Sequence, residues 1–152
     1  METLVHGTCV ALGGFAALLR APCGGGKSDL ALRFLFLPAG ALEARPALVA
    51  DDQVLLRRTG EHIVASCPPA LAGKIEVRGL GIVSMRTCAE QARLTLIADL
   101  DSGCDVPRYP AKDEWETVLG VPVRRIVLDP FEMTAPVKLA LVLQNFLERE
   151  AS

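Results

Sequence analysis

A glycine-rich segment near the start of the chain has the residue types that hold phosphate. Residues 21–28 read Ala-Pro-Cys-Gly-Gly-Gly-Lys-Ser and fit G-x-x-x-x-G-K-[ST] at the last three positions, with alanine at the first. In such a loop successive backbone N–H groups point at phosphate oxygens, which requires backbone angles that glycine reaches without strain. Lys27 then adds a positive charge near the β- and γ-phosphates, and the Ser28 hydroxyl can ligate Mg²⁺. The residues predicted to bind the phosphates are Ala21, Pro22, Cys23, Gly24, Gly25, Gly26, Lys27 and Ser28.

The alternative for this segment is a glycine turn that happens to precede a helix. The motif requires a strand before the loop and a helix after it. An apolar run at Phe15–Leu19 precedes the loop, and a helix that starts at Lys27 would direct its positive dipole end at the same anion. This context favours a phosphate loop, and Ala21 only requires that its corner of the loop keeps φ negative.

Two adjacent acids, Asp51 and Asp52, follow the continuous apolar run Ala47–Ala50, which predicts a central buried strand beside the phosphate loop. In phosphate-loop enzymes an acid at this place holds Mg²⁺, and phosphorylation of a hydroxyl needs a carboxylate that orients it and accepts its proton. Neighbouring strand residues point to opposite faces, so the two acids could divide these roles. The alternative is a solvated strand end.

Four further side chains are weaker candidates. Glu76 and Arg78 are two apart on a predicted strand and share a face, which fits either a surface ion pair or a metal ligand beside a phosphate clamp. His6 precedes the first predicted strand, and Arg108 lies in a long loop; a lone histidine or arginine in such places is more often structural or solvated.

The elements that would position these residues are short and mostly β. Two hairpins are predicted, one from Thr8–Leu12 with Phe15–Leu19 and one from Val54–Arg58 with His62–Ser66. Single strands are predicted at Ala47–Ala50, Lys74–Arg78, Leu94–Leu100 and Arg125–Leu128. Helices are predicted at Leu30–Leu37 and Ala135–Glu148, and a long loop with room for one short helix at 101–122. We therefore expect one α/β domain over residues 1–152, with a mixed, largely hairpin-connected sheet and flanking helices.

Composition excludes several classes of protein. With 51% hydrophobic and 22% charged residues the chain is globular, and a net charge of −2 gives no footprint for nucleic acid. We expect no membrane partner, because the apolar opening is broken by Gly13 and Gly14 and lacks a basic start. The five cysteines form no C-x-x-C pair, so we expect free buried thiols in a cytoplasmic protein, with Cys23 as an exposed and reactive exception.

Taken together, His6-Gly7, GGGKSD, LVADD and EVRGLGI resemble the catalytic domain of HPr kinase/phosphorylase. EVRGLGI, residues 76–82, is the most specific of these motifs. The resemblance is clear over residues 5–85 and looser over 104–148. It implies a P-loop kinase domain with a fold like that of phosphoenolpyruvate carboxykinase, and an enzyme that transfers phosphate from ATP to a regulatory serine of the phosphocarrier protein HPr.

The resemblance also implies residue roles. Ser28 and Glu76 would hold Mg²⁺ with help from Asp51, and Asp52 would accept the serine proton. His6, Lys27, Arg78 and Arg108 would complete the catalytic site. The family usually forms hexamers, so a homo-oligomer is expected.

The chain departs from the family in three places. The family's N-terminal domain is expected to be absent, a serine of the phosphate loop is Cys23, and a Pro-Gly-Arg-Asn turn associated with dephosphorylation is replaced within residues 129–138. We therefore hypothesise a protein that is mainly or only a kinase. The rival interpretations are a P-loop kinase or nucleotide hydrolase acting on a small metabolite, and a non-catalytic nucleotide-sensing or partner-binding module.

Overall fold

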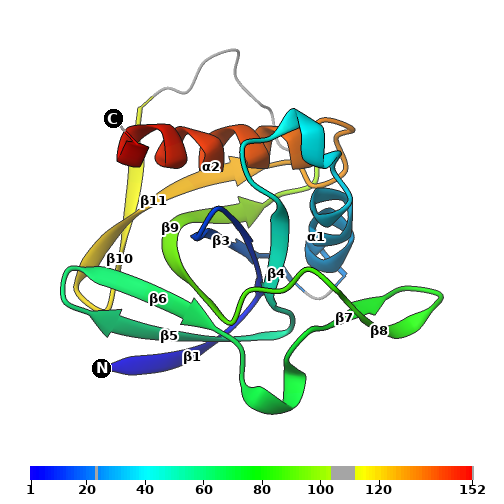
Figure 1. Cartoon of the computed structure of the whole chain (residues 1–152), viewed down its shortest axis with the longest axis horizontal. Helices are drawn as coiled ribbons and strands as arrows, with labels where there is room; N and C mark the ends of the chain where they lie inside the picture. The colour runs from blue at the N-terminus through cyan, green and yellow to red at the C-terminus, as the bar shows by residue number, and fades with distance from the viewer. Residues whose placement is uncertain (23, 104–111, 152) are drawn as a thin grey trace.

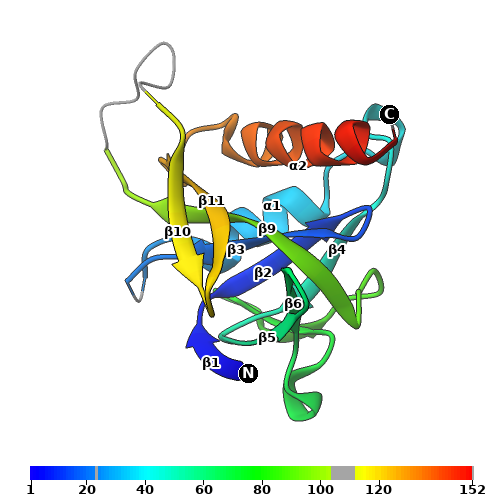
Figure 2. The same cartoon turned by 90° about the vertical axis from the view of Figure 1, so that its left-hand side faces the viewer.

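The computed structural model describes residues 1–22, 24–103 and 112–151. Within these ranges nine strands form one strongly curled sheet, and two further strands form a separate hairpin (Figures 1 and 2). The strands are β1 (Glu2–His6), β2 (Thr8–Leu12), β3 (Phe15–Arg20), β4 (Pro46–Ala50), β5 (Gln53–Thr59), β6 (His62–Ser66), β7 (Lys74–Val77), β8 (Gly81–Ser84), β9 (Gln91–Leu100), β10 (Glu114–Val118) and β11 (Val121–Leu128). The helices are α1 (Lys27–Leu35) and α2 (Ala135–Ala151), with short 3₁₀ turns η1 (Ala39–Ala41) and η2 (Pro69–Leu71).

The sheet is mixed, as the sequence predicted. Its main path runs β1-β5-β6-β9-β3-β2-β4, and β11 pairs with β9 and carries β10 on its other side. The pairs β3–β9 and β9–β11 are parallel, whereas the remaining pairs are antiparallel. Because the carboxyl ends of parallel strands meet at one edge, the segments after β3, β9 and β11 all emerge on the same side of the molecule.

Two apolar cores lie on the two faces of this sheet. One contains Phe34 of α1 and Leu139 of α2 against Leu19 and Leu96 of the sheet, so both helices cover one face. The other contains side chains of β2, β4, β5, β6, β9 and β11, including Val54, and is enclosed by the curl of the sheet itself (Figure 2). Because β3 and β9 are packed on both faces, the end of β3, where the phosphate loop begins, is held rigidly.

Both predicted β-hairpins are confirmed. β2 pairs with β3 around Gly13-Gly14, and β5 pairs with β6 around Gly60-Glu61. The two helices are also present: α1 starts at Lys27, as the phosphate-loop motif predicted, and ends at Leu35, two residues before the end of the apolar run Leu30–Leu37. The C-terminal helix extends to Ala151.

Three strands were missed by the sequence prediction, which is wrong there. β1 lies at the sheet edge and ends at His6, which therefore does not precede the first strand. β8 completes a hairpin with β7, and β10 pairs with β11 inside the segment that was predicted to be a loop. The physical reason is that exposed or edge strands lack a clear apolar alternation, so tertiary pairing alone stabilises them.

The strand before the acid pair was also placed wrongly. β4 is not central but ends the main path of the sheet, next to β2. It is nevertheless buried, because the chain at Thr87–Ala89 exchanges hydrogen bonds with Leu48 along its outer edge. A continuous apolar run indicates that both faces of a strand are buried. An edge strand whose outer side is covered is buried in the same way as a central strand, so the pattern does not distinguish them.

Candidate active site

The phosphate loop connects the carboxyl end of β3 to the amino end of α1. Gly24 and Gly26 have φ of 78° and 91°, the left-handed region that glycine tolerates, and Gly26 is the N-cap of α1. A Cβ atom at Gly25 would lie 2.5 Å from the Cβ of Ala21 and 2.7 Å from the carbonyl oxygen of Pro22. The loop is therefore wound too tightly for side chains, as expected of a backbone cradle for phosphate.

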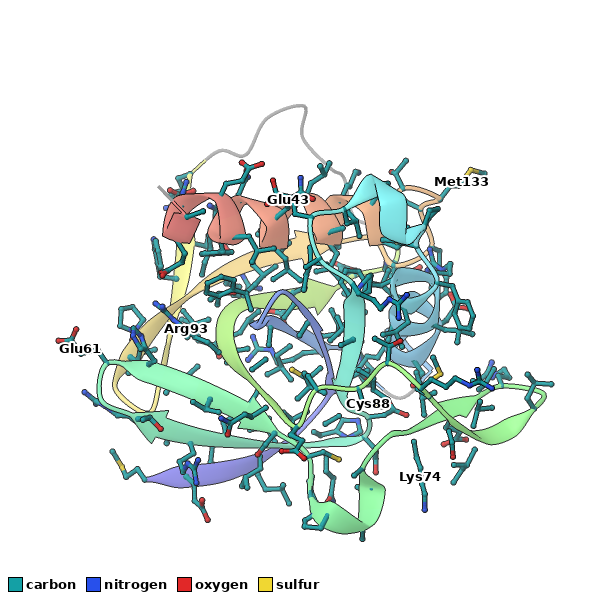
Figure 3. All side chains as sticks on the ribbon, viewed as in Figure 1. Glu43, Glu61, Lys74, Cys88, Arg93 and Met133 are labelled. Atoms are coloured by element: carbon teal, nitrogen blue, oxygen red, sulfur yellow. The ribbon has the colours of Figure 1, made fainter. Side chains whose placement is uncertain are left out.

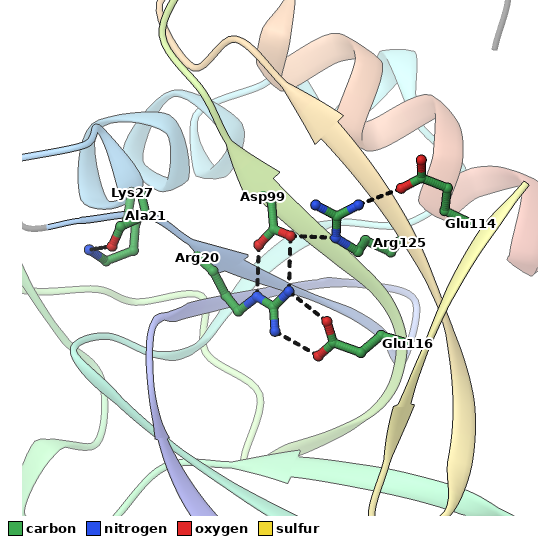
Figure 4. Close-up of polar contacts among 7 residues, drawn as sticks. All are labelled: Arg20, Ala21, Lys27, Asp99, Glu114, Glu116 and Arg125. Atoms are coloured by element: carbon green, nitrogen blue, oxygen red, sulfur yellow. Dashed lines mark hydrogen bonds and ion pairs between the residues drawn. The ribbon is translucent and has the colours of Figure 1, made fainter. Parts of the chain in front are cut away.

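Lys27 and Ser28 stand at the start of α1, where the sequence placed them. The Lys27 side chain folds back over the loop, and its Nζ donates to the carbonyl oxygen of Ala21 at 3.0 Å (Figure 4). A bound phosphate would offer this ammonium group a charged acceptor in place of a neutral one, and charge-assisted hydrogen bonds are the stronger kind.

Asp51 is the centre of a polar cluster beneath the phosphate loop. Its Oδ1 accepts hydrogen bonds from the Ser28 hydroxyl at 3.1 Å and the Thr8 hydroxyl at 2.8 Å, and its Oδ2 accepts from the Glu76 backbone N–H at 3.0 Å. The Asp51 residue is 7% exposed, so this carboxylate is satisfied almost entirely by protein groups. Thr8 was missed by the sequence analysis; its only signal is a hydroxyl at the start of an otherwise apolar strand.

Asp52 points the other way, into solvent. Its φ of 72° is left-handed, so a backbone turn rather than strand alternation separates the two acids. The Asp52 Oδ1 lies 3.4 Å from the His6 Nδ1, with both side chains more than half exposed, at 68% and 60%. An approaching macromolecule could therefore reach the Asp52 carboxylate directly.

The side chains of Ser28 and Asp51 are suited to hold a magnesium ion. No group of three histidine, cysteine, aspartate or glutamate residues that could hold a metal occurs in the described ranges. Magnesium is typically held by one or two carboxylates together with phosphate oxygens and water. A hydroxyl and a carboxylate 3.1 Å apart beside the phosphate loop suit that arrangement.

Glu76 and Arg78 are not arranged as the sequence suggested. β7 ends at Val77, so Arg78 lies in the turn before β8 and does not share a strand face with Glu76. No ion pair joins the two among the described side chains, and the contact of Glu76 to the site is made by its backbone N–H. Arg108 and Cys23 lie outside the described residues.

The cysteines are free where the structure describes them, but only one is buried. Cys9 is fully buried, Cys67 is half-buried and Cys88, labelled in Figure 3, is exposed. The expectation of buried thiols is therefore wrong for Cys88, whose Sγ instead donates to the Met85 carbonyl in a loop. Burial raises the pKa values of the Cys9 and Cys67 thiols, which disfavours reactive thiolates at these two positions.

A network of charged side chains connects the strand that precedes the phosphate loop to its neighbouring strands. The sequence did not predict this network. Arg20, the residue before the loop, donates to both carboxylate oxygens of Asp99 and to Glu116, and Arg125 donates to Asp99 and Glu114 (Figure 4). These residues join β3, β9, β10 and β11. Only Arg20 directly follows an apolar run, and no local pattern in the sequence marks Glu114 or Glu116 as partners of the two arginines.

This network should make stability depend on pH. Burial raises the Asp99 pKa, but hydrogen bonds from Arg20 and Arg125 outweigh it and lower that pKa below its ordinary value of 3.8. A lowered folded-state pKa contributes stability above the unfolded-state pKa that is lost as pH falls through the folded one. We expect Asp99→Asn to be less stable than wild type near neutral pH, with the difference in unfolding free energy narrowing as the pH falls below the ordinary Asp pKa of 3.8. Urea unfolding at several pH values measures this, and a gap that stays constant would contradict it.

The tight winding of the loop gives a second prediction. Gly25→Ala should weaken nucleotide binding by about 5- to 150-fold, the equivalent of about 1–3 kcal/mol of overpacking. Gly40→Ala is a matched control, because a Cβ there meets nothing within 4 Å. Calorimetric titration with Mg–ATP provides the measurement. Equal affinities for the two variants would show that the loop is not the binding element.

Most of the sequence matches a known protein family. Residues 1–140 match the family model described as the HPr serine kinase C-terminal domain. The chain belongs to this family. The described residues contain no helix with the length and hydropathy needed to cross a membrane.

Relatives and a solved structure agree with this assignment. The chain is 35% identical over 136 residues to HPr kinase/phosphorylase of Bordetella pertussis, covering 83% of this chain and 42% of the relative. It is 36% identical over 135 residues to that of Azoarcus sp., covering 82% and 41%. It thus spans less than half the length of these curated relatives. The HPr(Ser) kinase/phosphatase structure from Coxiella burnetii has the same fold, with a TM-score of 0.79, 21% identity and 99% of both chains covered.

Proposed function

We propose that this HPr kinase domain transfers the γ-phosphate of ATP, with Mg²⁺, to a serine hydroxyl of the protein HPr. The observation that carries the proposal is the contact between the phosphate loop and the acid pair. Ser28 donates to the buried Asp51, and the next residue, Asp52, turns outward beside His6. The phosphate loop and the exposed Asp52 carboxylate therefore lie next to each other.

In this proposal the loop amides and Lys27 hold the β- and γ-phosphates. Ser28 and Asp51 would hold the Mg²⁺, which neutralises charge on the phosphates when bound. Asp52 orients the incoming serine hydroxyl and accepts its proton as the serine oxygen bonds to the γ-phosphorus and the bond to the leaving ADP oxygen breaks. His6, next to Asp52, is placed to share that proton.

The protein nature of the acceptor is supported by the exposure of Asp52. A base for a small metabolite is usually enclosed in a pocket that excludes water. Here the carboxylate stands at the surface, where a loop of another protein can present its serine. On the family resemblance, we also propose that Arg78 and Arg108 complete the catalytic site. On the same ground we propose a cytoplasmic location and a homo-oligomer.

The test is transfer of labelled γ-phosphate from ATP to purified HPr in the presence of Mg²⁺. HPr whose regulatory serine is replaced by alanine is the control acceptor. Label on wild-type HPr alone supports the proposal. Label on a small metabolite alone would identify the rival kinase, and ATP binding without transfer would identify a binding module.

We also propose that the reverse reaction, phosphorolysis of phospho-HPr, is minor or absent. The support is the replacement of the family's turn by Asp-Pro-Phe-Glu-Met-Thr-Ala-Pro at residues 129–136. Incubating phospho-HPr with inorganic phosphate and the enzyme tests this. Phosphate-dependent formation of unmodified HPr would refute it.

A further inference from the structure

An exposed aromatic ring lies directly against the phosphate loop. Phe131, in the segment between β11 and α2, is 58% exposed, although it touches the loop. A Cβ atom at Gly26 would lie 3.3 Å from the Phe131 Cζ and 3.2 Å from the Pro130 Cβ. The ring therefore borders the cradle while leaving most of its surface open to solvent.

The segment that carries Phe131 is fixed from both helices. Arg33 of α1 donates to the carbonyl oxygens of Pro130 and Glu132, and Lys138 of α2 pairs with the Glu132 carboxylate. The Phe131 backbone N–H donates to the Asp129 Oδ1 at 3.0 Å. A ring held on such a braced turn loses little freedom when it contacts a ligand, which favours binding.

The sheet order indicates which part of a nucleotide would meet this ring. At the carboxyl edge the order is β11-β9-β3-β2-β4, with the phosphate loop following β3. Asp51 and Asp52 follow β4, so the reacting end of a phosphate chain points to that side. The other end of the chain must leave toward the side of β9 and β11. Phe131 follows β11 and stands on that side.

We propose that Phe131 is the stacking platform for the base of the bound nucleotide. This rests on the proposed function, because it assumes a nucleoside triphosphate in the phosphate loop. Bases stack on aromatic side chains regardless of their identity, since each presents a π face. Phe131 thus supplies affinity for the nucleoside part, and the loop supplies affinity for the phosphates.

The experiment compares ATP with inorganic tripolyphosphate, which has the phosphates but no base. Binding of each, with Mg²⁺ and without HPr, is measured by calorimetry for wild type, Phe131→Ala, Phe131→Tyr and Met133→Ala. Phe131→Ala should weaken ATP binding by about 5- to 150-fold and leave tripolyphosphate binding unchanged. Phe131→Tyr should retain ATP affinity. Met133, two residues away, 92% exposed and at the edge of the molecule in Figure 3, is the matched control and should change neither.

The outcomes separate this inference from the proposed function. If wild type binds neither ligand, the nucleotide site itself is refuted, and this inference with it. If wild type binds both but Phe131→Ala weakens both equally, Phe131 only shapes the loop through Gly26. If Phe131→Ala changes neither, the base lies elsewhere. Each of the last two results overturns the stacking role and leaves the nucleotide site standing.

Discussion

Asp52→Asn is expected to lower phosphoryl transfer to HPr by about 10²–10⁴-fold while Mg–ATP still binds with wild-type affinity. Asp52 is the exposed acid of the pair, and among the described residues its side chain pairs with His6 and not with the phosphate loop. Asparagine is the suitable replacement because, unlike alanine, it readily adopts the left-handed φ of 72° found here. The loss would then reflect the missing proton acceptor and not a distorted turn.

Single-turnover transfer and calorimetric titration with ATP measure the two halves of this prediction. Glu61→Gln is the matched acid-to-amide control, since Glu61 lies at the β5–β6 turn, far from α1 and the phosphate loop (Figure 3). It should leave both quantities unchanged. Transfer at the wild-type rate by Asp52→Asn would remove Asp52 from the reaction. A parallel loss of ATP affinity would instead assign it to binding.

Asp51→Ala should destabilise the protein itself, even without nucleotide. The change removes the acceptor of the fully buried Thr8 hydroxyl, together with those of Ser28 and of the Glu76 N–H. A buried donor left without a partner costs about 1–3 kcal/mol. For a chain of this size, that is a fall in Tm of roughly 2–12 °C. We also expect Mg²⁺-dependent ATP binding to weaken.

The adjacent acid gives the control for this effect. Asp52→Asn should leave Tm unchanged, because Asp52 is solvent-exposed. The double variant Thr8→Val/Asp51→Ala should lose less stability than the sum of the two single variants, because both remove one shared hydrogen bond. Thermal unfolding of the apo protein decides the matter. Strict additivity would show that Asp51 and Thr8 act independently.

Much of the candidate site could be predicted from local sequence. The Gly-Gly-Gly-Lys-Ser run dictates the loop because only glycine tolerates its backbone angles, and the apolar runs on either side dictate a strand and a helix. The same local rules predicted both hairpins. These features depend on neighbouring residues alone, so the sequence by itself determined them.

What the sequence left open depended on contacts between distant segments. The parallel pairing of β3 with β9, the edge position of β4 and the bond from Thr8 to Asp51 join residues far apart in the chain, and no local pattern encodes them. The same is true of Phe131, which follows the last strand yet lies against Gly26 of the phosphate loop. The sequence by itself therefore determined that a phosphate loop and an acid pair exist. Only the tertiary structure decided that Asp51 is buried under the loop, that Asp52 faces solvent and that an aromatic ring borders the phosphate loop, because burial and orientation are set by packing between elements.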